Sequence, residues 1–105
     1  MTAQLMFLGA GHTASDEIIL VDPDRALITG DIVQNRVVPA VSSSGGSFTS
    51  WLAVLDKVAQ MKVKIVVPDH SDVGDASLIS QEREQILPKI FIHQSSKEVV
   101  VKDFA

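Results

Sequence analysis

The stretch VKIVVPDH, residues 63–70, joins an apolar, mostly β-branched run to a proline and then a histidine. Valine and isoleucine favour buried strands, and proline cannot continue a ladder of hydrogen bonds inside a sheet. The stretch therefore predicts a buried strand over residues 63–67. Pro68 ends that strand, and His70 falls in the loop that follows it.

Two further loops have the same form, an apolar run followed by a polar group with metal-binding chemistry. GAGHT at residues 9–13 carries His12, and TGD at residues 29–31 carries Asp31. Zinc accepts histidine nitrogen and aspartate oxygen, and three protein ligands plus water suffice for one catalytic zinc site. A two-metal site needs more groups than these. Taken singly, His12 also fits a loop residue bonded to backbone, and Asp31 fits a turn cap.

The order GHT, GD and PxH resembles the C-terminal half of the metallo-β-lactamase fold superfamily. The segments SWLA at residues 50–53 and LD at residues 55–56 strengthen the resemblance, which extends over roughly residues 5–87. It implies an α/β fold, with a mixed sheet of about five strands and two helices packed on one face. Such a fold is half of the family's αββα sandwich.

The resemblance also implies roles for the three loop residues. His12 corresponds to the third histidine of one metal site, and His70 to the last histidine, on a second metal. Asp31 corresponds to the carboxylate that bridges the two metals and takes part in catalysis. The implied cofactor is zinc, one or two ions once the site is complete, which lowers the pKa of bound water toward ~7. The implied class is hydrolase, with thioesters and lactams among the family's substrates.

This chain departs from the family pattern in its ligand set. The family's HxHxDH motif is absent. The one remaining histidine of this chain, His93, stands outside any such pattern and is expected at the surface. Asp69 occupies a position where the family usually has glycine. It either orients the His70 ring, as carboxylates beside metal ligands commonly do, or is a solvated turn residue. Asp16, four residues after His12, either supports the site's loop or caps a turn.

Two hypotheses about partners follow. In the first, a complementary N-terminal half completes the active site, and this chain alone is inactive. In the second, the chain is a non-catalytic homodimer or larger homo-oligomer, and its ligand residues are relics or a weak single-metal site. Half a sandwich exposes an apolar sheet face, which a two-fold copy could cover. Strand residues such as Ile19 and Val66 are expected on that face.

Composition limits the remaining possibilities. A chain of 105 residues predicts one domain, residues 1–105, and 46% hydrophobic residues exclude general disorder. A net charge of −4 disfavours a nucleic-acid partner. The absence of cysteine excludes disulfides and thiolate ligands and fits the cytoplasm. The N-terminus lacks the positive region of a signal peptide, and no apolar stretch approaches the ~20 residues of a membrane helix.

Periodicity and turn chemistry predict the other elements. They are a strand at residues 5–8, a hairpin of strands at 17–21 and 26–29, a loop over the site mouth at 32–41, a helix at 48–61, a helix at 78–87 kinked or ended by Pro88, and a final strand at 98–101.

Overall fold

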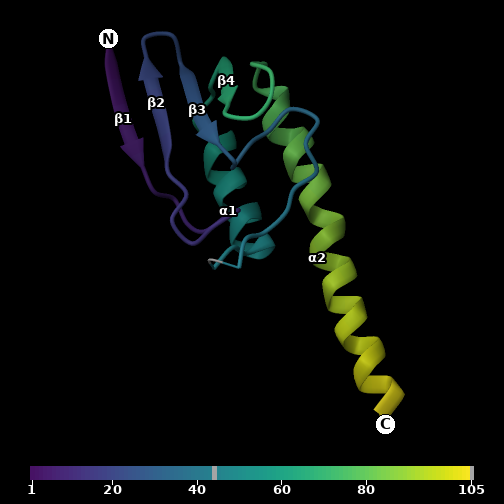
Figure 1. Ribbon diagram of the computed structural model, residues 1–105. Helices are drawn as coiled ribbons and strands as arrows, with labels where there is room; N and C mark the ends of the chain where they lie inside the picture. The colour runs from purple at the N-terminus through teal and green to yellow at the C-terminus, as the bar shows by residue number, and fades with distance from the viewer. Residues whose placement is uncertain (44, 105) are drawn as a thin grey trace.

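Four strands and two helices make up the computed structural model (Figure 1), which describes residues 1–43 and 45–104, with side chains as far as residue 90. The strands form one sheet in the order β1-β2-β3-β4. This is the predicted α/β fold with a mixed sheet, although the described residues hold four strands where about five were expected. The elements in chain order are β1 (Thr2–Met6), β2 (Ile18–Asp22), β3 (Ala26–Gly30), α1 (Phe48–Ala59), β4 (Ile65–Pro68) and α2 (Ser77–Phe104).

The strand directions bring three loops to one edge of the sheet. β2 runs antiparallel to both β1 and β3, while β3 and β4 are parallel. Consequently β1, β3 and β4 point the same way and end at the same edge (Figure 1). The three loops that leave this edge carry His12, Asp31 and His70.

The core lies between one face of the sheet and the helices. Leu20, Leu27 and Val66 are neighbours in register on that face and are buried. α1 begins after Ser47, whose side chain accepts the N–H of Ser50 and so caps the helix. Its buried side chains fall at helical spacing on one stripe and pack into the same cluster: Trp51, Val54, Leu55 and Val58.

The opposite face of the sheet is also apolar but is not covered by the described residues. Leu5 pairs with Ile19, Ile19 with Ile28 and Ile28 with Val67, so this row crosses all four strands on one side. Leu5 is 62% exposed and Ile28 is 39% exposed. We call this surface the outer face.

Val66 does not lie on the outer face, contrary to the expectation from sequence. Side chains along a strand alternate between faces, so Val66 and its neighbour Val67 point to opposite sides. Val66 is fully buried beneath the helices. Ile19 does lie on the outer face, through its pairing with Leu5 and Ile28.

The final strand predicted at residues 98–101 was wrong, because these residues are helical. Of the two outcomes expected at Pro88, a kinked helix or an ended helix, the structure excludes the ending, since Pro88 lies inside α2. Pro88 is exposed and removes one backbone hydrogen bond, whereas extending an existing helix adds one bond for each residue fixed. The side chain of His93 lies outside the described residues. Neither helix, within the described chain, is long and apolar enough to cross a membrane.

Candidate metal centre

The loop that carries His12 packs tightly on the core. Gly9 adopts a positive φ of 137°, which side chains rarely allow, and so turns the chain away from β1. A Cβ at Gly11 would collide with the side chain of Ile32 and lie 3.4 Å from Trp51. These glycines therefore let the His12 loop sit directly on buried side chains.

The ring of His12 is held by a backbone carbonyl. Its Nδ1 lies 2.6 Å from the carbonyl oxygen of Ala40. A carbonyl only accepts, so Nδ1 carries a proton, and in the neutral imidazole the lone pair is then on Nε2, which faces Asp31. Ligating histidines commonly make this arrangement, in which one ring N–H is bonded and the other nitrogen is free for metal.

Asp31 lies between the two imidazoles. A turn just after β3 fixes it, closed by the hydrogen bond from Ile32 N–H to the Thr29 carbonyl at 3.0 Å. Its Oδ2 is 4.0 Å from His12 Nε2, and its Oδ1 is 3.7 Å from His70 Nε2. Each carboxylate oxygen therefore faces a different histidine.

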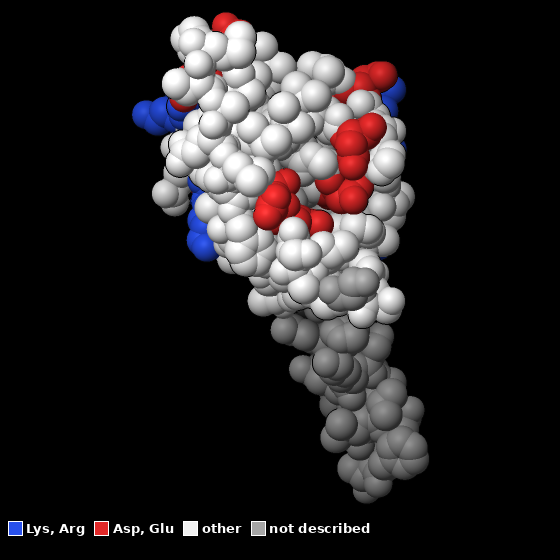
Figure 2. All heavy atoms as spheres, turned by 60° about the vertical axis from the view of Figure 1, so that its left-hand side comes forward, with Lys and Arg blue, Asp and Glu red and all other residues white. Residues whose placement is uncertain are grey.

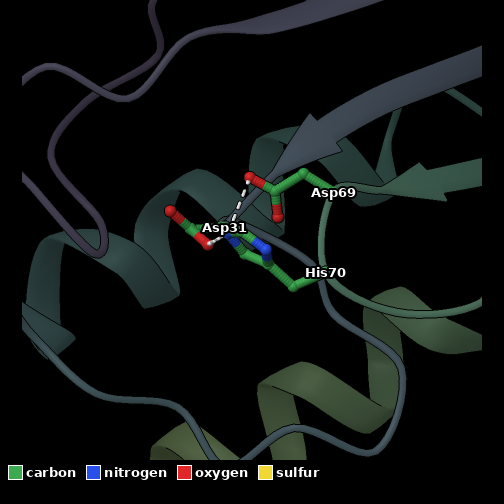
Figure 3. A group of neighbouring side chains, drawn as sticks. All are labelled: Asp31, Asp69 and His70. Carbon is green, nitrogen blue, oxygen red and sulfur yellow. Dashed lines mark ion pairs between the residues drawn. The ribbon is translucent and has the colours of Figure 1, made fainter.

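His70 and Asp69 stand in the loop after β4. Paired hydrogen bonds between Val66 and Gly74 close that loop at its base. Asp69 Oδ2 lies 3.4 Å from His70 Nε2, and Figure 3 shows the two carboxylates and the imidazole facing one another. His70 is the most exposed of these side chains, at 70%.

Gln34 joins the Asp31 loop to the Asp69 loop, a role that the sequence did not reveal. Its Nε2 donates to Asp31 Oδ1 at 3.1 Å and to Asp69 Oδ1 at 2.7 Å. The Ser71 hydroxyl donates to Gln34 Oε1 at 2.8 Å while accepting the Asn35 N–H. Because Ser71 supplies its proton to Oε1, the amide must turn its N–H groups toward the two carboxylates.

Asp16 lies apart from the other predicted site residues. Its two carboxylate oxygens accept from the backbone N–H of Thr13 at 2.8 Å and from the Thr13 hydroxyl at 2.7 Å. The contact is with the residue next to His12. Asp16 therefore braces the turn that carries His12.

A cavity of about 300 Å³ opens beside these residues. Residues 37–40 and Trp51 supply its apolar lining, so the segment predicted to form a loop over the site mouth does border the site. The Trp51 ring lies edge-on to His12, with 6.3 Å between ring centroids, and its N–H donates to the Ile32 carbonyl. Trp51 thus belongs both to the core and to the cavity wall.

Glu82 is a second residue that the sequence did not reveal. It lines the same cavity, is 1% exposed, and accepts the backbone N–H of Gln34 through Oε1 at 3.1 Å. Among the described residues Oε2 has no hydrogen-bond partner. Burial raises the pKa of Glu82 to about 7, with the Gln34 N–H opposing the shift. The signal in the sequence is a lone carboxylate on the apolar stripe of Leu78, Ile79 and Ile86.

The donor set suits a divalent cation. Asp31, Asp69 and His70 offer ligand atoms that all lie within 4.8 Å of one another, and His12 Nε2 faces the other oxygen of Asp31. Zinc binds imidazole nitrogen and carboxylate oxygen together. On the face shown in Figure 2, acidic side chains gather while Lys and Arg lie toward its margins, an arrangement that favours cations.

The fold and these side chains define a class, an α/β protein with a candidate metal-binding group on loops at one sheet edge. Residues 1–70 match the model of the metallo-beta-lactamase superfamily, and the chain belongs to that superfamily. A metallo-beta-lactamase type 2 of Bacteroides fragilis is 28% identical over 100 residues, which are 92% of this chain and 39% of the relative. A linear primary-alkylsulfatase of a Pseudomonas strain is 33% identical over 72 residues, 64% of this chain and 14% of the relative.

Solved structures agree with this assignment. The crystal structure of VMB-1 has a TM-score of 0.76 and 25% identity, over 85% of this chain and 42% of the other. A metallo-beta-lactamase from Pontibacter korlensis has a TM-score of 0.73 and 26% identity, over 81% of this chain and 41% of the other. The chain thus spans well under half the length of the relatives it matches.

Proposed function

We propose that this chain contributes the carboxyl-side half of a zinc-dependent hydrolase site, which a second half completes with the remaining ligands. The observation that carries the proposal is the placement of Asp31 between two histidines. Its Oδ2 faces His12 Nε2 at 4.0 Å and its Oδ1 faces His70 Nε2 at 3.7 Å. A carboxylate in that position can hold two cations side by side.

Each side chain then has a distinct task. Zinc bound here would lower the pKa of water to about 7 and polarise the substrate's carbonyl, phosphoryl or sulfuryl oxygen. His12 is presented with Nε2 free because Ala40 holds its Nδ1 proton. Gln34 fixes the carboxylate planes of Asp31 and Asp69, which limits their motion when a substrate binds.

The cavity wall suggests which part of a substrate this half contacts. Residues 37–40 and Trp51 are mainly apolar and lie next to the ligands, so they suit an apolar portion attached to the reacting group. The relatives' names indicate β-lactams and alkyl sulfates as the first compounds to test. The absence of cysteine is compatible with a reducing compartment such as the cytoplasm.

The outer face supports the requirement for a second half. Leu5, Ile28 and Ile65 are exposed together on one side of the sheet. Apolar patches of this kind mark association surfaces. A complementary half that packs there and brings the HxHxDH ligands would cover the patch and complete the site in one step.

Complementation tests this proposal. The chain is mixed with a polypeptide carrying the HxHxDH half of the superfamily, and zinc content and hydrolysis of β-lactams, thioesters and alkyl sulfates are measured. We expect zinc uptake and hydrolysis in the mixture, lost with Asp31→Asn and kept with Asp72→Asn. A mixture that forms a complex but neither holds zinc nor hydrolyses any of these compounds would contradict the proposal.

The second candidate is a non-catalytic homodimer that pairs two outer faces. The same exposed row of Leu5 and Ile28 favours it, since a two-fold axis through this face would bury each row against its copy. The oligomeric state of the chain alone separates the candidates. If the chain forms a homodimer but the complementary half still binds it, the hydrolase candidate is favoured, because that half must displace one copy of the chain.

A further inference from the structure

We propose that Asp69 is a direct metal ligand, and that with Asp31 and His70 it forms a single-ion site held by this chain alone. The ion is a divalent cation of the zinc and cobalt class, bound by two carboxylates and one imidazole. The inference deepens the proposed function, on which it rests for the metal-binding character of Asp31 and His70. It assigns a ligand at a position where the resembling family usually has glycine.

The first argument is which nitrogen of His70 the carboxylate faces. A carboxylate that merely orients a ligating histidine accepts from the ring nitrogen turned away from the metal. Asp69 Oδ2 instead lies 3.4 Å from Nε2, the same atom that Asp31 Oδ1 approaches at 3.7 Å. Both carboxylates thus converge on one nitrogen, as ligands of a shared ion do (Figure 3).

The second argument is the spacing of the donor atoms. Two ligands each about 2.1 Å from a tetrahedral ion are separated by about 3.4 Å. The distance from Asp69 Oδ2 to His70 Nε2 is 3.4 Å. The three side chains offer atoms within 4.8 Å of one another, so small rotations bring all of them to a common ion.

The third argument is how the two carboxylates are held. The Gln34 amide donates to Oδ1 of Asp31 and Oδ1 of Asp69, which leaves Oδ2 of Asp69 directed at His70. A neutral amide fixes the positions of two like charges but does not neutralise them, whereas a divalent cation would. His12 faces the far oxygen of Asp31 at 4.0 Å and is therefore not required by this ion.

The absence of cysteine from the chain provides a direct test. Asp69→Cys places a single thiolate at the proposed ligand position, and the variant is titrated with Co²⁺. We expect a sulfur-to-cobalt charge-transfer band in the near ultraviolet that saturates at one ion per chain. The matched control is Asp72→Cys, which replaces an exposed aspartate in the same loop and should give no band.

Affinity provides the second measurement, by competition of wild type and Asp69→Asn against a chromophoric chelator for Co²⁺. We expect Asp69→Asn to weaken binding at least about tenfold. Asp72→Asn should bind as wild type does, and circular dichroism of each metal-free variant checks that it is folded. Both the band and the loss of affinity are required. If Asp69→Asn loses affinity but Asp69→Cys gives no charge-transfer band, Asp69 only positions other ligands. Either a missing band in Asp69→Cys or an unchanged affinity in Asp69→Asn overturns the proposal.

The outcome also separates this inference from the proposed function. If the chain alone binds no Co²⁺ but the complemented pair holds zinc and hydrolyses substrate, the single-ion site is overturned and the hydrolase stands. If the charge-transfer band of Asp69→Cys and the affinity loss of Asp69→Asn both appear but the complemented pair is inactive, the single-ion site stands and the hydrolase is contradicted.

Discussion

Glu82 Oε1 accepts the backbone N–H of Gln34 at 3.1 Å, a bond between residues 48 positions apart in the sequence. It fastens α2 to the loop that carries Asp31, and Glu82 is 1% exposed. The carboxyl group that makes this bond has a pKa raised to about 7 by burial. The attachment between helix and loop is therefore sensitive to protonation near neutral pH.

The stability of the fold should fall as the pH rises toward neutrality. The folded state binds the Glu82 proton up to about pH 7, whereas a carboxyl at its ordinary value of 4.5 has already released it. Proton binding by Glu82 therefore adds up to about 3 kcal/mol to the free energy of unfolding below about pH 4.5. This stabilisation is lost as the pH rises through about pH 7. Urea unfolding of wild type and Glu82→Gln across this range measures it. Glu82→Gln should remove the dependence, and Glu84→Gln, on the exposed side of α2, should keep it.

Replacement of His12 should remove one ion from the completed site and none from the chain alone. Plasma mass spectrometry of the complemented pair, purified without chelator, gives zinc per complex. Because His12 faces the oxygen of Asp31 opposite to His70, His12→Ala should lower the content by about one ion. An unchanged zinc content in His12→Ala, with the complex intact, would show that His12 is only a loop residue bonded to Ala40.

Trp51→Phe should destabilise the chain by about 1–3 kcal/mol. The indole fills the core at 2% exposure, and its N–H is bonded to the Ile32 carbonyl at 2.8 Å. Phenylalanine leaves both a void and a buried carbonyl without its donor. Urea unfolding followed by circular dichroism measures the loss, with Val38→Ala, at 73% exposure, as a control expected to change little.

Ile28→Glu should weaken association through the outer face. Ile28 lies in the middle of the row that crosses the four strands, and burying a carboxylate there is costly. Sedimentation velocity of the variant should show at least about a tenfold weaker association, with a second half or with another copy. Val73→Glu changes an exposed side chain in the loop after β4 and should associate as wild type does. Equal association of both variants would place the interface elsewhere.

Much of the fold could be predicted because local chemistry and tertiary packing agree. The apolar run at residues 63–67 does contain a strand, and the stripe of Trp51 and Leu55 does face the core. The strand predicted at residues 98–101 is helical instead, although valine favours strands. An established helix extends at little cost, and α2 continues through Pro88 and this segment.

The site was only partly predictable. Apolar runs followed by polar groups indicated His12, Asp31 and His70, because strands that end at one edge bring their loops together. The roles of Gln34 and Glu82 depend on contacts across 35 and 48 positions, which no local pattern encodes. Asp69 was expected to orient His70 or to face solvent, and only the choice of the Nε2 atom suggested a third role.

The Gln34 amide has a consequence for the order of assembly. It ties the loop after β3 to the loop after β4 inside one polypeptide, and Ala40 holds His12 in the same way. The geometry of these donors is therefore set when the chain folds, before any companion arrives. The second half proposed above would therefore meet donors whose relative positions this chain has already set.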